Sequence, residues 1–346
     1  MLATPLCDRL GIQLPIVQAP IGSAATPELV AAVADAGGLG MLALTWVTEQ
    51  QAVDRIRRVG QLTDRPFGVN LVLDFPIDDI LGACLDEGVP VVSTFWGDPA
   101  SVTERVHAAG ALHLHTVGTA EEARRVVDAG VDVVVAQGWE AGGHVWGQVA
   151  TMALVPAVVD AVQPVPVIAA GGIGDGRGLA AVLALGAQAG WLGSRFLTAA
   201  EAATHEVYRR QVLAAAPQDA VYTCCFDGGW PDAAHRAIRN STITEWELAG
   251  RPAAPGRPGE GAVVATDRRG HPHLRYGAML PVPGMTGDVE AMALYAGQSV
   301  GLIHDVVPAA RIVAAVASQA ARILASFGRN AAAGVRLGED EQPHGR

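Results

Sequence analysis

The residues best suited to acid–base chemistry lie in one glycine-rich stretch, Gln137-Gly138-Trp139-Glu140-Ala141-Gly142-Gly143-His144. The histidine follows two glycines and comes shortly after an apolar run, residues 131–138, that is typical of a buried strand. An unperturbed imidazole titrates at a pH of about 6.5, so this side chain could exchange protons near neutrality. Most histidines in surface loops have no such role, but a position beside Gly-Gly at a strand end favours one. We therefore predict that His144 is the catalytic acid–base residue.

Two later strand ends carry glycines that suit a phosphate group. Gly171-Gly172 lies in the apolar run at 166–173, and Gly193-Ser194 lies in the run at 189–196. A phosphate binds where several backbone N–H groups can approach it without an intervening Cβ, and a serine adds a hydroxyl. One such turn could be only a tight connection between a strand and a helix. Two of them, at the seventh and eighth strands, favour a phosphate site because barrels place phosphates there.

The elements that must position these loops alternate regularly along the first part of the chain. Apolar runs rich in β-branched residues, typical of strands buried on both faces, occupy residues 16–20, 39–44, 67–73, 89–96, 111–117, 131–138, 166–173 and 189–196. Helical patterns lie between them, for example at 26–36, 48–60, 99–109, 119–129 and 177–185. Thr26 before Pro27, and Thr119 three residues before Glu122, are typical helix starts.

Eight strand–helix units in about 200 residues predict an α/β fold, a parallel (β/α)8 TIM barrel. A doubly wound sheet is the alternative, but it more often has about five or six units and a Gly-x-Gly-x-x-Gly stretch after its first strand. No such stretch follows residues 16–20. Because a barrel carries its site at the carboxyl ends of the strands, we assign Ala19, Pro20 and Ile21 after the first strand, and Asn70 on the third, to the cofactor site.

The regular alternation stops after residue 200, and we divide the chain into four parts. Residues 1–205 form the predicted barrel with its cofactor site, and residues 206–287 form an added helical cap that contributes to the substrate site. Helices at 288–328 are expected to return to the barrel, and residues 329–346 form a flexible polar tail.

Composition excludes several classes of function. The 346 residues carry a formal net charge of −11 and include no lysine. An acidic chain without a basic run is a poor partner for nucleic acid, and the lack of lysine excludes Schiff-base and P-loop chemistry. Four cysteines without a CxxC pair are typical of reduced thiols in a cytoplasmic protein, and no spacing indicates a metal site. With no signal peptide and no apolar run of about 18 residues, we expect no membrane span.

Several residues near the predicted site could have either of two roles. Tryptophans gather there, and they could pack against a flat cofactor or substrate or only hold loops in place: Trp96, Trp139, Trp146, Trp191 and Trp230. His113 and His115 lie on the fifth strand, where one or both could point toward the barrel mouth. The sequence leaves the roles of His115 and Trp146 open.

The stretch at 137–144 closely resembles the signature loop of the nitronate monooxygenase family, formerly called 2-nitropropane dioxygenases. The resemblance extends to Gln18-Ala19-Pro20, Phe67-Gly68-Val69-Asn70, Ala169-Ala170-Gly171-Gly172-Ile173, Leu192-Gly193-Ser194-Arg195-Phe196 and Tyr295-Ala296-Gly297-Gln298. It therefore covers nearly the whole chain, from about residue 5 to residue 328. The role of Gln298 in the last of these segments stays open.

The resemblance implies a non-covalently held FMN in the barrel and makes His144 the catalytic histidine. It assigns to FMN the residues Asn70, Gln137, Gly142, Gly172, Trp191, Leu192, Gly193 and Ser194, which join Ala19, Pro20, Ile21 and Gly171 in the predicted cofactor site. FMN-dependent enoyl-acyl-carrier-protein reductases and NADH:quinone reductases share the Gly-Gly-His loop. In the enoyl reductases an acid usually follows, whereas this chain continues with Val145-Trp146-Gly147-Gln148.

The implied reaction is the FMN-dependent oxidation of an alkyl nitronate or small nitroalkane by O₂ to a carbonyl compound and nitrite, with His144 as base. NAD(P)H-dependent reduction of an enoyl thioester or a quinone is the alternative enzyme. A flavin-binding protein without turnover is a third hypothesis, which the intact histidine and glycines disfavour. The expected partners are a small-molecule substrate and O₂, and a homodimer is the assembly that we consider.

Overall fold

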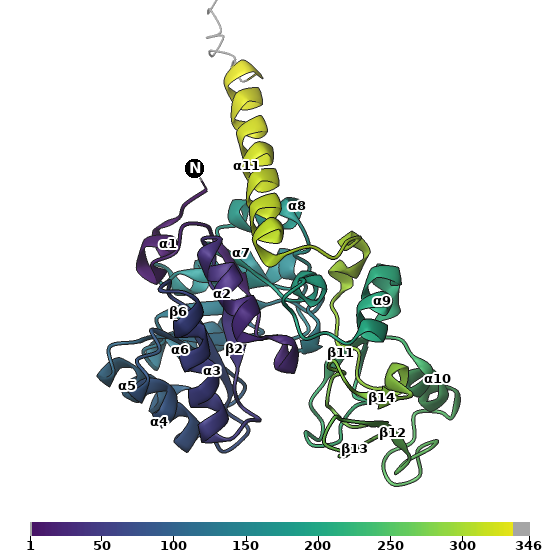
Figure 1. Cartoon of the computed structure of the whole chain (residues 1–346). Coiled ribbons are helices and arrows are strands. Elements are labelled where there is room, and N and C mark those ends of the chain that lie inside the picture. Colours follow the sequence, from purple (N-terminus) through teal and green to yellow (C-terminus); the bar gives the residue numbers. More distant parts are fainter. Residues whose placement is uncertain (1, 335–346) are drawn as a thin grey trace, which may run out of the picture.

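Eight parallel strands form the centre of the computed structural model, which describes residues 2–334 (Figure 1). They are β1 (Ile16–Gln18), β2 (Met41–Ala43), β3 (Gly68–Val72), β4 (Val91–Phe95), β5 (Leu112–Val117), β6 (Val133–Gln137), β8 (Val167–Ala170) and β9 (Ala189–Leu192). The order in the sheet is β1-β9-β8-β6-β5-β4-β3-β2, and a parallel bridge from Val17 to Leu39 joins its two ends. The predicted (β/α)8 barrel is therefore confirmed, with each strand somewhat shorter than its apolar run.

Helices connect successive strands and cover the outside of the barrel. They are α2 (Pro27–Asp35), α3 (Glu49–Leu62), α4 (Asp78–Asp86), α5 (Ala100–Ala108), α6 (Ala120–Asp128), α7 (Thr151–Val162) and α8 (Gly176–Ala184), with η1 (Gly22–Ala24) before α2 and η2 (Ser194–Thr198) after β9. The Thr26 side chain accepts a hydrogen bond from the backbone N–H of Leu29, and Thr119 accepts one from Glu122. Both predicted helix starts are thus formed by side-chain caps, which satisfy amides that the first helical turn leaves free.

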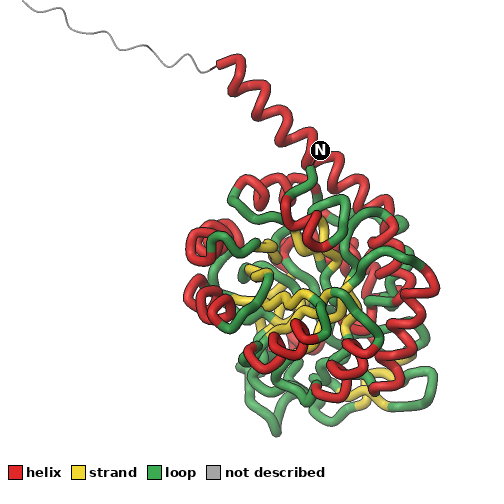
Figure 2. The backbone as a smooth tube through the Cα atoms, turned by 90° about the vertical axis from the view of Figure 1, so that its left-hand side faces the viewer, coloured by secondary structure: helices red, strands yellow, loops and turns green. Residues whose placement is uncertain are grey.

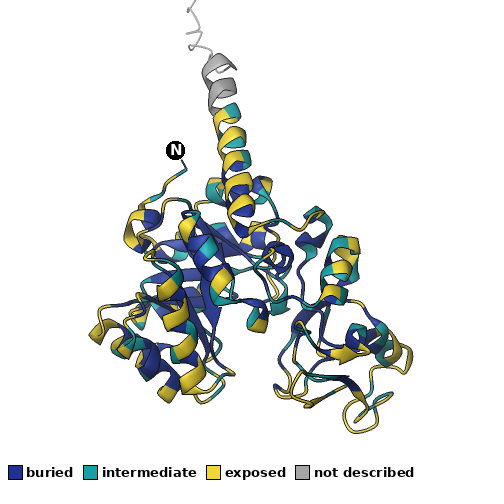
Figure 3. Ribbon diagram, in the orientation of Figure 1, coloured by how far each residue is buried: buried dark blue, intermediate teal, exposed yellow. Residues whose placement is uncertain are grey.

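The barrel interior is filled by aliphatic side chains, since every second residue of each strand points inward. Val17, Met41 and Leu114 belong to this inner cluster, and the short helix α1 (Pro5–Leu10) closes its amino-terminal end with Leu6 and Leu10. The opposite faces of the strands pack against the surrounding helices in two further clusters. Figure 3 shows the outcome: the barrel strands are buried, whereas the outward sides of the surrounding helices are exposed.

The histidines of the fifth strand lie outside the barrel interior. The hydroxyl of Thr94 is 2.7 Å from Nε2 of His113 and 2.7 Å from Nδ1 of His115, and Oγ1 of Thr103 on α5 is 2.8 Å from Nδ1 of His113. Both imidazoles are buried in the layer between strands and helices. The sequence left open whether His113 or His115 points toward the barrel mouth. Neither does, because side chains alternate along the strand and Leu114, which lies between them, points into the interior.

The segment between the barrel and the last helix mixes helices with small sheets. It holds α9 (Glu206–Ala214), η3 (Pro217–Asp219), β10 (Ala220–Thr223), β11 (His235–Ile238), α10 (Ser241–Leu248), β12 (Val263–Thr266), β13 (Pro272–Leu274) and β14 (Thr286–Gly287). One sheet has the order β10-β11-β7, where β7 (Gly143–His144) lies in the loop between β6 and α7, and the other has the order β13-β12-β14. The predicted helical cap thus also contains strands, whose short lengths left no alternating pattern in the sequence (Figure 1, green).

The last helix, α11 (Ala309–Gly334), begins against the barrel and then projects away from it (Figure 2). It follows η4 (Val289–Ala291) and η5 (Gln298–Leu302), and its first turns bury Ile312 and Val316 with Leu179 of α8. Residues Ala309–Phe327 are long and apolar enough to cross a membrane by length and composition, although part of this stretch is buried in the structure. The helix continues past residue 328, into the segment that we predicted as a tail. Residues 335–346 of that segment lie outside the described part of the chain. The division of the chain into four parts stays a prediction.

The buried pair His113 and His115 predicts a loss of stability in mild acid. Burial lowers the pKa of His113 to about 3 and that of His115 to about 4, whereas both imidazoles titrate near 6.5 once unfolded. The pair's contribution is therefore complete above a pH of about 6.5 and is lost as the pH falls toward 4, because the unfolded chain binds the protons. We expect a cost of about 2 kcal/mol per histidine at pH 5.

Urea unfolding between pH 4.5 and 8 measures this effect. The variant His113→Gln should be less stable than the wild type at pH 8 but should show a shallower fall between pH 6.5 and 4.5. The exposed His304 provides the control, since His304→Gln should leave the slope unchanged. A slope that is identical in all three proteins would contradict the prediction.

Candidate active site

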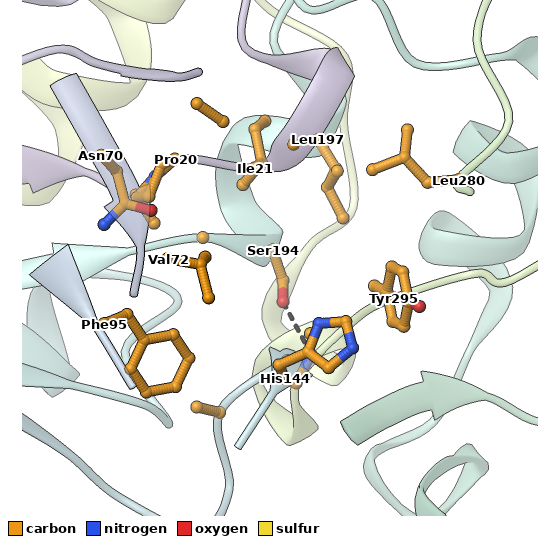
Figure 4. Close-up of a pocket in the computed structure, with 18 of the residues that line it drawn as sticks. Pro20, Ile21, Asn70, Val72, Phe95, His144, Ser194, Leu197, Leu280 and Tyr295 are labelled. Carbon is orange, nitrogen blue, oxygen red and sulfur yellow. Dashed lines mark hydrogen bonds between the residues drawn. The ribbon is translucent and has the colours of Figure 1, made fainter. Parts of the chain in front are cut away.

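A cavity of about 480 Å³ opens at the carboxyl ends of the barrel strands, where the loops of the barrel meet the added segment. It brings together twelve of the predicted site residues: Ala19, Pro20, Ile21, Asn70, Gln137, Gly142, His144, Gly171, Gly172, Trp191, Gly193 and Ser194. Leu192 is the exception, because its side chain lies on the outer face of β9 and packs with Leu29 and Val33 of α2. Figure 4 shows Pro20, Asn70 and His144 around the same space.

The glycine-rich loop is held at Glu140 from two sides. The carboxylate of Glu140 accepts hydrogen bonds from the backbone N–H of Thr151 at 2.9 Å and from its hydroxyl at 3.1 Å. The backbone N–H of Gln298 donates to the carbonyl oxygen of Glu140 at 3.0 Å. Glu140 therefore has a structural role that its position in the motif did not reveal, and Gln298 contacts the loop through its backbone.

Gln137, at the end of β6, bridges the two ends of the His144 segment. Its Nε2 donates to the carbonyl oxygen of His144 at 3.1 Å, and its Oε1 accepts from the backbone N–H of Trp146 at 3.2 Å. Trp146 itself packs on Trp96, with ring centroids 4.6 Å apart, and donates to Glu122. Trp146 therefore lies on the outer side of the loop and does not line the cavity.

A buried arginine joins the same loop to the added segment. Arg236 on β11 is 1% exposed and donates to the carbonyl oxygens of Trp139 and Ala220, each at 2.8 Å. Its guanidinium lies 4.5 Å from the ring centroid of Trp139, a cation–π contact. Strand β11 also pairs with this loop: Arg236 lies opposite Gly143, and His235 lies opposite His144. No sequence motif marked Arg236, because its partners are backbone carbonyls of distant segments.

His144 lies among aromatic rings rather than among charges. Its ring is 4.1 Å from the ring centroid of Trp230, tilted by 33°, and 5.4 Å from that of Tyr295. Burial, and secondarily the neighbouring His235, lower the pKa of His144 to about 3. The expectation of titration near neutrality is therefore wrong for this environment, and the imidazole is neutral at pH 7. Its Nε2 is buried and has no hydrogen-bond partner among residues 2–334.

Trp230 covers His144 and ties the added segment to the barrel. It is 5% exposed, and its Nε1 donates to Oδ2 of Asp74, in the loop after β3, at 2.9 Å. Trp46 and Phe75 pack around the same indole at centroid distances of 6.0 and 5.2 Å. The sequence placed this tryptophan in the cap; only the folded chain shows that it forms the wall of the cavity above the histidine.

The glycine turns at β8 and β9 form a small cradle of free amides. No protein hydrogen bond is found for the backbone N–H of Gly172, Gly193 or Ser194 within the described residues. A Cβ built on Gly193 would stand 3.6 Å from that of Ala19, an ordinary contact, so the empty space there belongs to the cavity. Gly172 has a φ of +73°, which favours glycine by itself. Within residues 2–334 no group of three His, Cys, Asp or Glu side chains could hold a metal ion.

A closed parallel barrel with a lined cavity at the carboxyl ends of its strands is the arrangement of barrel enzymes. The family model for nitronate monooxygenase matches residues 3–80 and 75–319. The chain thus belongs to the nitronate monooxygenase family, and it is an enzyme, a flavin oxidoreductase of that kind.

The proteins that this chain is similar to differ in the activities that their names give. The chain is 39% identical over 253 residues, 72% of its length and 70% of the relative's, to a (3aS,4S,5R,7aS)-5-hydroxy-7a-methyl-1-oxo-octahydro-1H-indene-4-carboxyl-CoA dehydrogenase of Mycobacterium tuberculosis. Among solved structures it resembles FabK from Thermotoga maritima, with a TM-score of 0.79 and 33% identity over 94% of this chain and 98% of that one. The nitroalkane oxidase of Streptomyces ansochromogenes gives a TM-score of 0.77 and 34% identity over 94% and 100%.

The contacts of Arg236 predict that the variant Arg236→Met unfolds more easily. The methionine fills part of the space but leaves the buried carbonyl oxygen of Ala220 without a donor, at about 1–3 kcal/mol, and removes the donors to the partly buried carbonyl oxygen of Trp139. We expect Tm to fall by several degrees and the cavity residues to lose their arrangement. Arg239→Met, which removes an arginine paired with Glu247 at the surface, is the control and should change Tm little. An equal effect of both substitutions would contradict this account.

Proposed function

We propose that this protein oxidises alkyl nitronates with FMN and O₂, giving a carbonyl compound and nitrite. The observation that supports it most is His144, a neutral imidazole with an unpartnered nitrogen in an apolar cavity beside the glycine cradle. Membership of the nitronate monooxygenase family and the likeness to a nitroalkane oxidase favour the same reaction.

The residues around the cavity fit FMN. The free amides of Gly172, Gly193 and Ser194 suit a phosphate that carries two negative charges, and the hydroxyl of Ser194 adds a polar contact. Asn70 on β3 and the backbone at Ala19 and Pro20 line the space that remains for a flat ring system. When bound, FMN supplies the transfer of electrons between the organic substrate and O₂.

His144 suits an anionic nitronate better than a neutral nitroalkane. With a pKa of about 3, the imidazole is a weak base, and removal of an α-proton from a neutral substrate would be slow. A nitronate has already lost that proton and offers two negatively polarised oxygens. A neutral imidazole can donate a hydrogen bond to one of them, in an environment where Trp230 and Tyr295 exclude water. We therefore assign to His144 the orientation and polarisation of the nitronate.

A second candidate is an NAD(P)H-dependent reaction on a thioester or quinone. It is favoured by the identity with a dehydrogenase whose named substrate is a carboxyl-CoA compound. Anaerobic mixing of the purified protein with a nitronate, with NADH and with NADPH, each separately, distinguishes the two. Flavin bleaching by the nitronate alone supports the proposal. Rapid bleaching by NADH or NADPH, without response to the nitronate, would replace it by the second candidate.

The glycine cradle predicts the outcome of a substitution at Gly193. The variant Gly193→Val should fold, because the backbone there has a negative φ of −103° and the added Cβ makes only ordinary contacts. Its side chain would occupy the space that the phosphate needs, so FMN affinity should fall by at least about tenfold. Gly172 is less suitable, since its positive φ would strain the backbone in any variant.

The measurement is the FMN content after purification and the Kd of added FMN. Gly60→Val is the matched control, since Gly60 on α3 has open space around it and lies away from the cavity. Full FMN affinity in a folded Gly193→Val protein, or a wild type that neither retains nor takes up FMN, would refute the assignment.

The assigned role of His144 predicts graded effects of two variants. His144→Ala should keep FMN and lower kcat/KM on a preformed nitronate by about 10- to 100-fold, the value of a hydrogen bond to a charged group. His144→Gln should recover part of this loss, because its amide also donates. On the neutral nitroalkane, activity should be low in all three proteins. Near wild-type values for His144→Ala on the nitronate, with a loss of about 10²–10⁴-fold on the nitroalkane, would show instead that His144 is a base.

A further inference from the structure

The cavity contains a single charged side chain, Arg55 of α3. The other side chains that line it within the described residues are apolar, aromatic or neutral polar, and His144 is neutral. Arg55 is partly buried, and burial lowers its pKa, with no neighbouring carboxylate contributing to the shift. Guanidinium groups nevertheless stay protonated in proteins, so the cavity holds one positive charge.

The neighbouring arginines on the same helix are paired, whereas Arg55 is not. Arg57 contacts Glu87 at 2.7 Å and Arg58 contacts Glu28 at 3.1 Å, and both pairs are partly exposed. No ion pair or hydrogen bond is found for Arg55 among residues 2–334. A partly buried charge loses some of its hydration and, without a partner, gains no ion pair in exchange. In a chain with 35 acidic residues and only 24 arginines, such an arginine is best explained by a ligand that supplies the anion.

Arg55 and the glycine cradle come from different strand–helix units of the barrel. Helix α3 follows β2, whereas the cradle residues follow β8 and β9, and β1 separates β2 from β9 around the closed barrel. Arg55 therefore lines the cavity from the side of β2, as do Trp46 and Val47 in the loop before α3. Trp46 contacts Trp230, which in turn covers His144, so an apolar wall extends from the histidine toward the arginine.

We propose that Arg55 binds an anionic group carried by the organic substrate, at the end remote from its reacting carbon. The substrate class is then an acid with an apolar body, which packs along Trp230 and Trp46, and not a short unsubstituted nitroalkane. This inference rests on the proposed function for the position of the reacting carbon at His144. The planar guanidinium suits a carboxylate, which it can bind through two parallel hydrogen bonds.

Calorimetric titration with straight-chain carboxylic acids tests the proposal without turnover. One carboxylate imitates the planar, anionic nitronate, and a second carboxylate at the far end is the group that Arg55 should bind. For chains of four to ten carbons, the ratio of Kd values for the monoacid and the diacid of equal length is measured. In the wild-type holoenzyme the diacid should bind at least about tenfold more tightly at one or more lengths.

The variant Arg55→Met should bring this ratio close to one, and Arg55→Lys should keep a part of the preference because it keeps the charge. Arg58→Met, a surface position on the same helix, should leave the ratio unchanged. Absence of a diacid preference at every length, or its persistence in a folded Arg55→Met protein, would overturn the proposal. Loss of FMN from Arg55→Met would overturn it as well, by showing that the arginine serves the cofactor phosphate. A wild type that prefers diacids but does not oxidise nitronates would sink the proposed function alone.

Discussion

The pairing of Gly143 and His144 with β11 is the contact on which the site depends. It is only two residues long, yet it fixes the backbone of the glycine-rich loop to a strand of the added segment. Arg236 strengthens it by donating to carbonyl oxygens on both sides of the junction, and Glu140 holds the start of the loop through Thr151. Because the loop glycines have little rigidity of their own, these contacts set the position of the imidazole.

The same junction determines the electrostatics of the cavity. Closing the added segment over the barrel places Trp230 on one face of His144 and Tyr295 nearby, which removes water from the imidazole and keeps it neutral. In such a low-dielectric space each remaining polar group has a strong effect. We therefore propose that the free amides of the glycine cradle and the guanidinium of Arg55 are the groups that bind anions in the cavity.

Much of the barrel could be predicted because its signals are local. Short apolar runs, capping residues such as Thr119 and glycines at the ends of helices repeat with a period that one architecture explains. The strands of the added segment could not be predicted in this way. β10 and β11 are four residues each, and their pairing partners include β7, which is distant in the sequence.

The site shows the same division. The sequence by itself determined the barrel, the glycine turns at the ends of β8 and β9 and the histidine after Gly-Gly, since these depend on residue type and spacing along one stretch of chain. Only the tertiary structure decided that Leu192 faces away from the cavity, that His113 and His115 lie outside the barrel and that Trp230 covers His144. It also decided the protonation of His144 and the isolation of Arg55, because desolvation and the absence of an ion partner arise from segments that meet only in the folded chain.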